Sequence, residues 1–490
     1  MTTQNTTHEQ ADATLNADLI AQVRAIAQRE ISALSLIQAS LRRIAHLNDR
    51  LHAFCTVDEA GALAQAAEID RRLAAGEDIG PLAGVPVAIK DLICTRGLRT
   101  TFGSRLYADF VPEEDDVVVE RLRAAGAIIV GKTNTSEFGY GAVGHNPLFP
   151  TTRNPWNTAL TPGGSSAGSA AAVLTRMVPL ALGSDGGGSV RIPASLTGLF
   201  GIKPSWGRVP VYPGCRDERY PGVSSWESLE HIGPMTRNAA DAALALSVLT
   251  GPTSRDRYSI PVDSGDWQLP ARAEIERKRV AFSVDMGFAV VDPEVRKAFA
   301  GAIRQLNGIL EQPPMDEHPD IGHTQAMFET LVAMDTDRAG LKAMSESQEL
   351  ELQGWLGSLV AREWTGDEFT AAIMERKRIV NQTWRFFERY DFLLTPTTAA
   401  PAFPIDQDGP ASIDGQPVPA TAWIAFSALA NLTGLPSASV PIGKTRDGWP
   451  IGLQITGCHL DDRGVLALAS LIESLFEPHA WSDEIIKIQR

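Results

Sequence analysis

The sequence predicts an α/β protein in which short buried strands alternate with amphipathic helices. Residues 85–89 and 127–130 are apolar runs of strand length, and neither has a polar face. Helical patterning at 116–125 leads into the second run, and an alanine-rich helical segment at 166–177 leads into a further apolar run at 179–182. Because strands without a polar face need helices on both sides of their sheet, this alternation predicts a sheet with both faces covered.

The composition is that of a globular protein with a sizeable core. Of the 490 residues, 44% are hydrophobic and 21% are charged, which excludes global disorder. The 59 acidic and 44 basic residues give a net charge of −15, which argues against a nucleic-acid partner because such a partner needs clustered Lys and Arg. The cysteines lie far apart with no C-x-x-C pair, so neither a zinc site nor a disulfide framework is predicted (Cys55, Cys94, Cys215 and Cys458).

Residues 1–16 are polar and are predicted to be disordered. This segment lacks the basic and then apolar pattern of a signal peptide. No stretch of the chain is long and apolar enough for a transmembrane helix. We therefore expect a cytoplasmic protein with no membrane partner.

Residues 17–490 are predicted to form one domain that contains several irregular or helical segments. Asp292 and Pro293 have the N-cap and first-turn chemistry of a helix start. The further expectations are two amphipathic helices within 17–54, a polar surface connection at 251–274, strands at 280–284, 391–395 and 437–441, a helical insertion at about 324–390, and an irregular covering loop with six prolines at 396–420.

Two glycine-serine turns, at 161–169 and 183–193, give the strongest chemical signal. Three glycines precede Ser189, and the backbone amides of Gly186, Gly187, Gly188 and Ser189 are predicted to form an oxyanion hole. A nucleophilic serine also needs a base, yet none of the nine histidines lies in a glycine-rich turn. Lys90 follows an apolar strand, where desolvation would lower the pKa of its amine enough for it to act as the base.

These turns resemble the amidase signature family. The resemblance rests on GGSSAGS at 163–169 and GSDGGGSVRIP at 183–193, and it extends to GVPVAIKD at 84–91, GKTNTSEF at 131–138, GPMTR at 233–237 and PIGLQ at 450–454. It implies a Ser-Ser-Lys triad in which Ser189 is the nucleophile, Lys90 is the base, and Ser165 bridges the two and follows a cis peptide bond. It also implies a large mixed central sheet covered by helices, no metal or organic cofactor, a small-molecule substrate, and a monomer or homodimer.

Two positions depart from the family pattern. Ala167 stands where the family commonly has Gly, and Gly186 stands where the family has Thr or another side chain. Gly186 keeps its N–H, so we expect the oxyanion hole to survive the change. Asp185 and Arg191 are predicted to form a buried ion pair that braces the serine loop, and Ser166 to form hydrogen bonds at the start of the following helix.

Four further positions are candidates for substrate binding. Gly139, Tyr140 and Gly141 lie where family members shape the acyl pocket, although a simple packed loop explains them equally well. Arg208 either faces the cleft or forms a surface salt bridge. Residues 126–133 match the G-x-x-x-x-G-K-[ST] phosphate-loop pattern, but their middle residues are Ala-Ile-Ile-Val, which predicts a strand and argues against a nucleotide site.

Three functions remain open. The first is a stand-alone serine amidase that cleaves an amide, anilide or carbamate, as acylamidases and urethane hydrolases do. The second is a glutaminase-like subunit of a tRNA-dependent amidotransferase; such subunits typically carry Gln where this chain has Ile192, so the first function is favoured. The third, a non-catalytic binding protein, is disfavoured because all three triad positions are intact. The apolar residues within 324–390 favour a hydrophobic substrate, although packing in a helix core explains them equally well.

Overall fold

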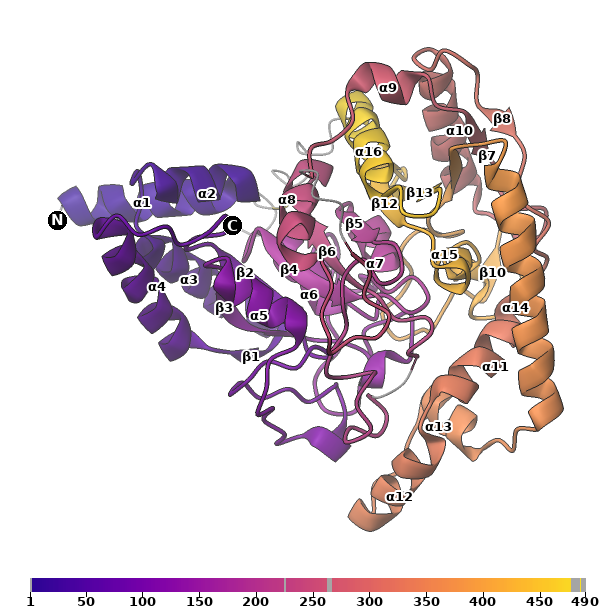
Figure 1. Cartoon of the computed structure of the whole chain (residues 1–490), viewed down its shortest axis with the longest axis horizontal. Helices are drawn as coiled ribbons and strands as arrows, with labels where there is room; N and C mark the ends of the chain where they lie inside the picture. The colour runs from indigo at the N-terminus through magenta and orange to yellow at the C-terminus, as the bar shows by residue number, and fades with distance from the viewer. Residues whose placement is uncertain (1, 224–225, 262–266, 477–484, 486–490) are drawn as a thin grey trace.

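The fold is built on a mixed sheet of 11 strands (Figure 1). A computed structural model describes residues 2–223, 226–261, 267–476 and 485. The strands of the sheet are β1 (Phe54–Val57), β2 (Pro86–Lys90), β3 (Ile128–Thr133), β4 (Leu180–Ser184), β5 (Phe200–Lys203), β6 (Ile232–Thr236), β7 (Val280–Phe282), β8 (Met315–Asp316), β9 (Phe392–Pro396), β12 (Ser437–Lys444) and β13 (Pro450–Gly457).

The strand order is β1-β3-β2-β4-β6-β5-β12-β13-β9-β7-β8. Strand β2 runs parallel to both β3 and β4, whereas β4 and β6 are antiparallel and β12 pairs antiparallel with β5 and β13. The sheet is therefore mixed, as the family resemblance implied. The buried strands β2, β3 and β4 are the apolar runs that the sequence predicted, each displaced by one to three residues at its ends.

Helices cover both faces of the sheet. They are α1 (Thr2–Asn16), α2 (Leu19–Ala27), α3 (Ala33–Leu51), α4 (Glu59–Ala74), α5 (Val117–Ala124), α6 (Ala167–Leu174), α7 (Arg191–Thr197), α8 (Ala239–Leu249), α9 (Arg272–Glu276), α10 (Pro293–Asn307), α11 (Gln325–Asp335), α12 (Arg338–Gln348), α13 (Gly354–Ala361), α14 (Gly366–Phe387), α15 (Ala428–Thr433) and α16 (Asp462–Phe476).

Alternate residues of β2 belong to two different cores. Val87 and Ile89 lie in the larger apolar cluster together with residues of α5 and α8. Ala88 lies in a second cluster with residues of α3, α4 and α6. Because successive side chains of a strand point to opposite faces, the two clusters lie on opposite sides of the sheet. The prediction of a sheet covered on both faces is confirmed.

The N-terminal segment differs from its prediction. Residues 1–16 were expected to be disordered, but Thr2–Asn16 forms helix α1. Ala11 and Leu15, which are only 1% and 0% exposed, lie one helical turn apart and join the larger core cluster. These two apolar residues in a largely polar sequence give helix α1 a face that packs against the core.

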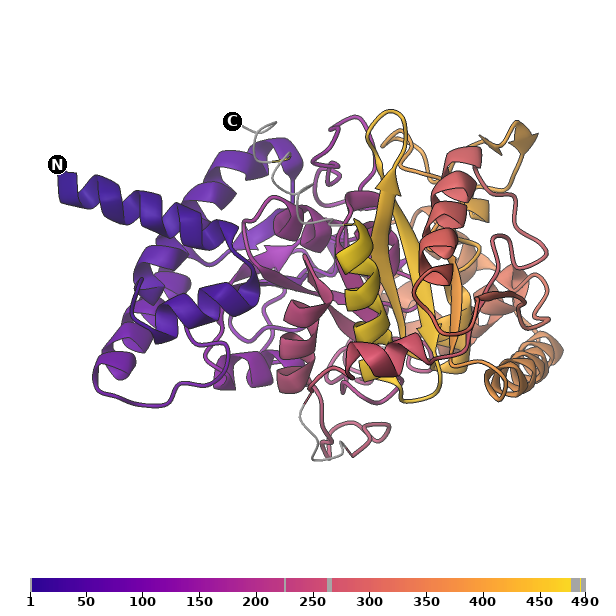
Figure 2. The same ribbon diagram turned by 90° about the horizontal axis from the view of Figure 1, so that it is seen from above.

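The segment predicted as a helical insertion contains the four helices α11 to α14. It forms the outer edge of the molecule at the right of Figure 1. In Figure 2 the C-terminal strands and helix α16 lie between the N-terminal helices and this segment. Residues 396–420 are mainly irregular apart from the paired β10 (Ser412–Ile413) and β11 (Gln416–Pro417), as predicted. Of the connection at 251–274, residues 262–266 lie outside the described residues.

The helix predicted at Asp292 begins there, and the Asp292 side chain accepts a hydrogen bond from the N–H of Glu294. Among the helices of the described residues, none combines the length and the apolar character that crossing a membrane requires.

Candidate active site

The candidate triad lies where two parallel strands end. Lys90 is the last residue of β2, and Ser184 is the last residue of β4, its parallel neighbour in the sheet. Because parallel strands finish at the same edge, this pairing brings the two side chains together. Ser165 precedes helix α6, and the Gly164–Ser165 peptide bond is cis, as the resemblance implied.

Lys90 is fully buried among serine oxygens. Its Nζ lies 2.7 Å from the Oγ of Ser165, 2.9 Å from the Oγ of Ser184 and 3.2 Å from the Ser184 carbonyl oxygen. Burial lowers the pKa of this amine to about 8, while the negative charges of Glu230 and Asp185 act in the opposite direction. About half of Lys90 is therefore neutral near pH 8, where a free lysine is almost fully protonated, and this favours its action as a general base.

The loop that carries Ser189 is held by Asp185. This buried carboxylate accepts hydrogen bonds from the Gly188 N–H at 2.7 Å and the Val190 N–H at 3.2 Å. Arg191 donates to it twice, from Nε at 3.0 Å and Nη2 at 2.9 Å, and both side chains are completely buried. The predicted ion pair is confirmed. Burial alone would raise the pKa of Asp185, but Arg191 and Asn431 outweigh it and hold the pKa below its usual range.

One amide of the predicted oxyanion hole is already used. The Gly188 N–H points to Asp185, because a buried carboxylate needs donors, and so it is not available to a substrate oxygen. Within the described residues, the amides of Gly186, Gly187 and Ser189 make no hydrogen bond. These three remain candidates for the oxyanion hole.

The predicted relay has one of its two links as a direct hydrogen bond. Lys90 and Ser165 are joined at 2.7 Å, whereas no hydrogen bond joins the hydroxyls of Ser165 and Ser189 in the described part of the chain. Both serines nevertheless line the same small cavity. Bonds of this kind are often long in unliganded enzymes and tighten when substrate binds. Ser166 is the N-cap residue of helix α6, and its carbonyl accepts a hydrogen bond from the Ala170 N–H at 3.1 Å, as predicted. Its side chain makes no cap bond; its Oγ donates to the Ser184 carbonyl at 3.3 Å instead.

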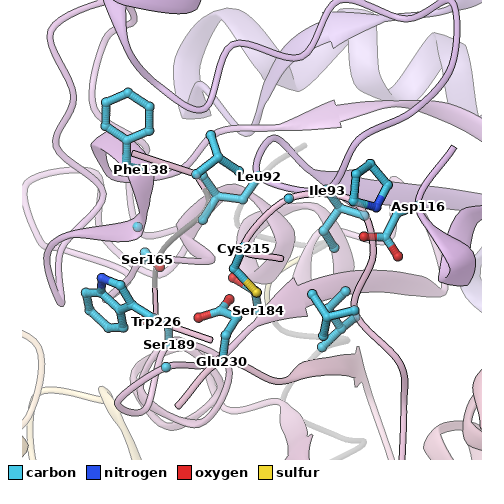
Figure 3. Close-up of a pocket in the computed structure, with 17 residues that line it drawn as sticks. Leu92, Ile93, Asp116, Phe138, Ser165, Ser184, Ser189, Cys215, Trp226 and Glu230 are labelled. Carbon is cyan, nitrogen blue, oxygen red and sulfur yellow. The ribbon is translucent and has the colours of Figure 1, made fainter. Parts of the chain in front are cut away.

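Two adjoining cavities reach Ser189. The smaller one is lined by Ser165, Ser184 and Glu230, and Figure 3 shows these side chains around it. The larger one is lined by Tyr140, Phe328 and Trp355 among others. Ser189 and Trp226 line both cavities. Ser189, the candidate nucleophile, thus lies where the smaller and the larger cavity meet. This position suits a residue that attacks a carbonyl carbon between the two parts of a substrate.

The larger cavity has an aromatic wall. Tyr140 and Trp226 pack edge to face with ring centroids 4.9 Å apart, and Phe328 and Trp355 each lie 5.9 Å from Trp226. Phe328 and Trp355 come from helices α11 and α13, so the predicted helical segment contributes to the site. Such a wall favours hydrophobic or aromatic groups.

The candidate substrate residues divide into two groups. Gly139, Tyr140 and Gly141 line the larger cavity, in agreement with the pocket interpretation. Arg208 lines neither cavity; it pairs with the carboxylate of Asp462 at 3.2 Å and donates to the Leu460 carbonyl. Arg208 therefore forms a salt bridge, as one of its two interpretations held, but the pair is largely buried and does not lie on the surface.

Three residues at the site were missed by sequence reasoning: Ser184, Trp226 and Glu230. Burial raises the pKa of Glu230 to about 7, against the opposing charge of Lys90 and hydrogen bonding from Ser184. Trp226 explains Gly186, because a Cβ at that position would lie 2.3 Å from the Trp226 ring. The only sequence signal for the contact between Gly186 and Trp226 was the unusual glycine at position 186.

The phosphate-loop pattern is a strand, as interpreted. Residues Ile128–Thr133 form β3, and Lys132 is buried with its amine donating to the hydroxyls of Thr95 and Thr100, both at 3.0 Å. In the described part of the chain, no cluster of three or more His, Cys, Asp or Glu has an arrangement that could hold a metal ion.

Comparison with known proteins assigns the family. The chain matches the family described as Amidase over residues 35–466. This chain belongs to the amidase signature family. It is accordingly a hydrolase that acts on carbon–nitrogen bonds.

Relatives within this family have different functions. The chain is 36% identical to a glutamyl-tRNA(Gln) amidotransferase subunit of Thermosynechococcus vestitus, over 94% of this chain and 98% of that protein. Among solved structures, a bacterial aryl acylamidase of the amidase signature family matches with a TM-score of 0.85 and 27% identity, covering 96% of this chain and 98% of that one. A 6-aminohexanoate cyclic dimer hydrolase matches with a TM-score of 0.82 and 27% identity, over 96% and 99% of the two chains.

Proposed function

We propose that this protein is a free-standing serine amidase that cleaves uncharged amides, anilides or carbamates with hydrophobic groups. The observation that carries the proposal is the fully buried amine of Lys90, 2.7 Å from Ser165 in a cavity shared with Ser189. Beside Ser189 lie amides with no partner among the described residues, and the adjoining wall is aromatic. A base, a nucleophile, oxyanion donors and an apolar pocket together suit acyl transfer.

In the proposed reaction, Ser189 Oγ attacks the substrate carbonyl carbon. Its proton passes to Ser165 Oγ as the Ser165 proton passes to neutral Lys90. The carbonyl oxygen becomes an oxyanion held by the amides of Gly186, Gly187 and Ser189. The C–N bond then breaks, the leaving amine takes the proton back through Ser165, and an ester remains on Ser189. Water attacks this ester by the same relay and releases the acid and Ser189.

The lining of the two cavities disfavours a substrate that carries a carboxylate. It includes no Lys or Arg among the described residues, whereas acidic side chains are present at Asp116, Glu137, Glu230, Glu329 and Asp408. Burial raises the pKa of Asp116 and Glu137, so these two carry less negative charge than free carboxyl groups. A free amino acid such as glutamine carries an α-carboxylate, which needs a cation for recognition. The aryl acylamidase neighbour and the aromatic wall support an aryl amide or aryl carbamate instead.

A glutaminase-like subunit of an amidotransferase is the second candidate, and the 36% identity to a protein of that kind favours it. Two observations argue against the amidotransferase function. The described cavity walls contain no Lys or Arg. Ile192 lines the larger cavity at the position where such subunits typically carry Gln.

The test is a hydrolysis panel with pure protein. It compares an anilide, a primary amide, an aryl carbamate and free glutamine, with S189A as the control. We expect turnover of the anilide or the carbamate, no turnover of glutamine, and no turnover of any substrate by S189A. Activity on glutamine alone would overturn the proposal in favour of the amidotransferase function.

A further inference from the structure

We propose that Glu230 is a positioning residue that acts through Ser184 to set the charge of Lys90. The inference deepens the proposed function, since it concerns how the base of that same site is kept available. It rests on the sheet register, on the contacts of Ser184 and on the charges around Glu230.

The pairing of β4 with β6 fixes Glu230 beside Ser184. Ser184 is the register partner of Ile232, and the backbones of Asp185 and His231 exchange two hydrogen bonds, of 2.8 and 3.2 Å. Glu230 is the residue immediately before His231. Figure 3 shows its carboxylate directed toward Ser184 at the wall of the smaller cavity. Its position is therefore set by the sheet.

Ser184 lies between the carboxylate and the amine. Its Oγ lies 2.9 Å from Lys90 Nζ, and Figure 3 shows the Glu230 carboxylate directed toward it. Interaction with Ser184 lowers the pKa of Glu230, against the effect of burial. A hydroxyl both donates and accepts, so Ser184 can transmit a proton or a charge between the two groups. Gly186 leaves the room for this arrangement, because a Cβ there would come within 2.8 Å of the Glu230 Oε2.

The other charges near this pair already have partners. Asp185, which also acts on Lys90 and Glu230, is bound by Arg191 and Asn431. Arg216, which also acts on Glu230, pairs with Asp256 and, at 3.8 Å, with Glu227. The neighbouring thiol of Cys215 has its pKa raised well above the usual value by burial and stays neutral. Among the ion pairs of the described residues none includes Glu230, so Lys90 is the cation with which it interacts most strongly.

The direction of the effect follows from the charges. An ionised Glu230 favours protonated Lys90 and raises the pKa of the amine, whereas burial lowers it. Removing the carboxylate removes a negative charge that raises the pKa of Lys90. The effect of burial, which lowers this pKa, then has less to oppose it, so the pKa of Lys90 falls further. Neutral Lys90, and with it the reactivity of Ser189, then appears at lower pH.

The experiment measures how fast a fluorophosphonate labels Ser189 between about pH 5.5 and 9.5, in the wild type and in E230Q. We expect the midpoint of the acid limb to move down by about one pH unit, the lower end of the range for an opposite charge nearby. The pH profile of kcat/KM should move by the same amount. E230D keeps the charge and should restore a midpoint close to that of the wild type.

The matched control is E218Q, the same change at an exposed position. Glu218 lines neither cavity, so the midpoint of Ser189 labelling in this variant should equal that of the wild type. E230A provides a second variant should E230Q not fold, since the half-buried Glu230 side chain lines a cavity and truncation there adds no atoms to the site. In an S184A background, the shift caused by E230Q should shrink.

An unchanged or raised midpoint in the folded variants would overturn the inference, even if activity fell. A shift of equal size with and without Ser184 would overturn the role of Ser184. Because labelling needs no substrate, these outcomes are distinct from failure of the proposed function, which would appear as an absence of Ser189 labelling in the wild type.

Discussion

Replacing Asp185 by Asn tests the brace of the serine loop. The change keeps the size of the side chain but removes the charge that pairs with Arg191 in a completely buried setting. Two of the hydrogen bonds of the guanidinium, at 2.9 and 3.0 Å, end on this carboxylate, while the others go to Ser427, Gln454 and Asn431. D185N therefore leaves a buried cation without its counter-charge.

The expected cost is large. Charged hydrogen bonds contribute about 1.5–3 kcal/mol each, and breaking a buried ion pair by removing one partner costs about 3–5 kcal/mol. We expect the free energy of unfolding, measured by urea denaturation at pH 7, to fall by about 3–5 kcal/mol. Ser189 labelling should slow as well, because one of the two oxygens that accept from the amides of Gly188 and Val190 becomes an NH₂ group, which cannot accept.

The control is D12N, which removes an exposed pair. Asp12 and Arg42 are 3.4 Å apart and about half exposed, so their interaction contributes at most about 1 kcal/mol. The pKa of Asp185 lies below its usual range, so its contribution is complete above the unfolded pKa of about 4 and disappears as pH falls through the folded value. The difference between wild type and D185N should thus be constant from about pH 6 to 8 and shrink below about pH 4. Equal losses in D185N and D12N would refute the reasoning.

Three other changes test the site. K90A and S165A should each lower turnover by about 10²–10⁴-fold, the range for loss of a general base, and the double variant should be little worse than either single variant. The control S166A should stay within about tenfold of the wild type. Additive losses in the double variant would contradict a single relay. G186V should destabilise the protein by about 1–3 kcal/mol, because its Cβ would lie 2.3 Å from the Trp226 ring. Adding W226A should recover part of this lost stability in a thermal melt. If no stability is recovered, Trp226 is not the side chain that clashes with Val at position 186. Exhaustive chelation should leave turnover unchanged, and a loss restored by zinc would contradict the metal-free relay.

The sheet and the triad could be predicted from the sequence for different reasons. The buried strands β2, β3 and β4 are continuous apolar runs, a signal that local sequence carries by itself. Strands β5, β6 and β13 contain Gly201, Gly233 and Gly452 and lack such a run, so they were missed. The triad positions came from the dense glycine-serine motifs, and the 2.7 Å contact of Lys90 with Ser165 agrees with them.

What could not be predicted depends on contacts between distant segments. Glu230 reaches Lys90 only because β4 pairs with β6, and a register of this kind leaves no local pattern. Gly188 looked like an oxyanion donor until the structure placed its N–H on the carboxylate of Asp185. Arg208 was ambiguous because its partner, Asp462, lies 254 residues away.

The central claim is that catalysis passes through an ester on Ser189. The most direct measurement mixes the enzyme with a slowly turned-over aryl carbamate or anilide, quenches the reaction in acid within the first turnover, and maps the peptides by mass spectrometry. We expect an added acyl mass on the peptide that contains Ser189, and no adduct in S189A. An adduct on another residue, or full turnover by S189A, would contradict it.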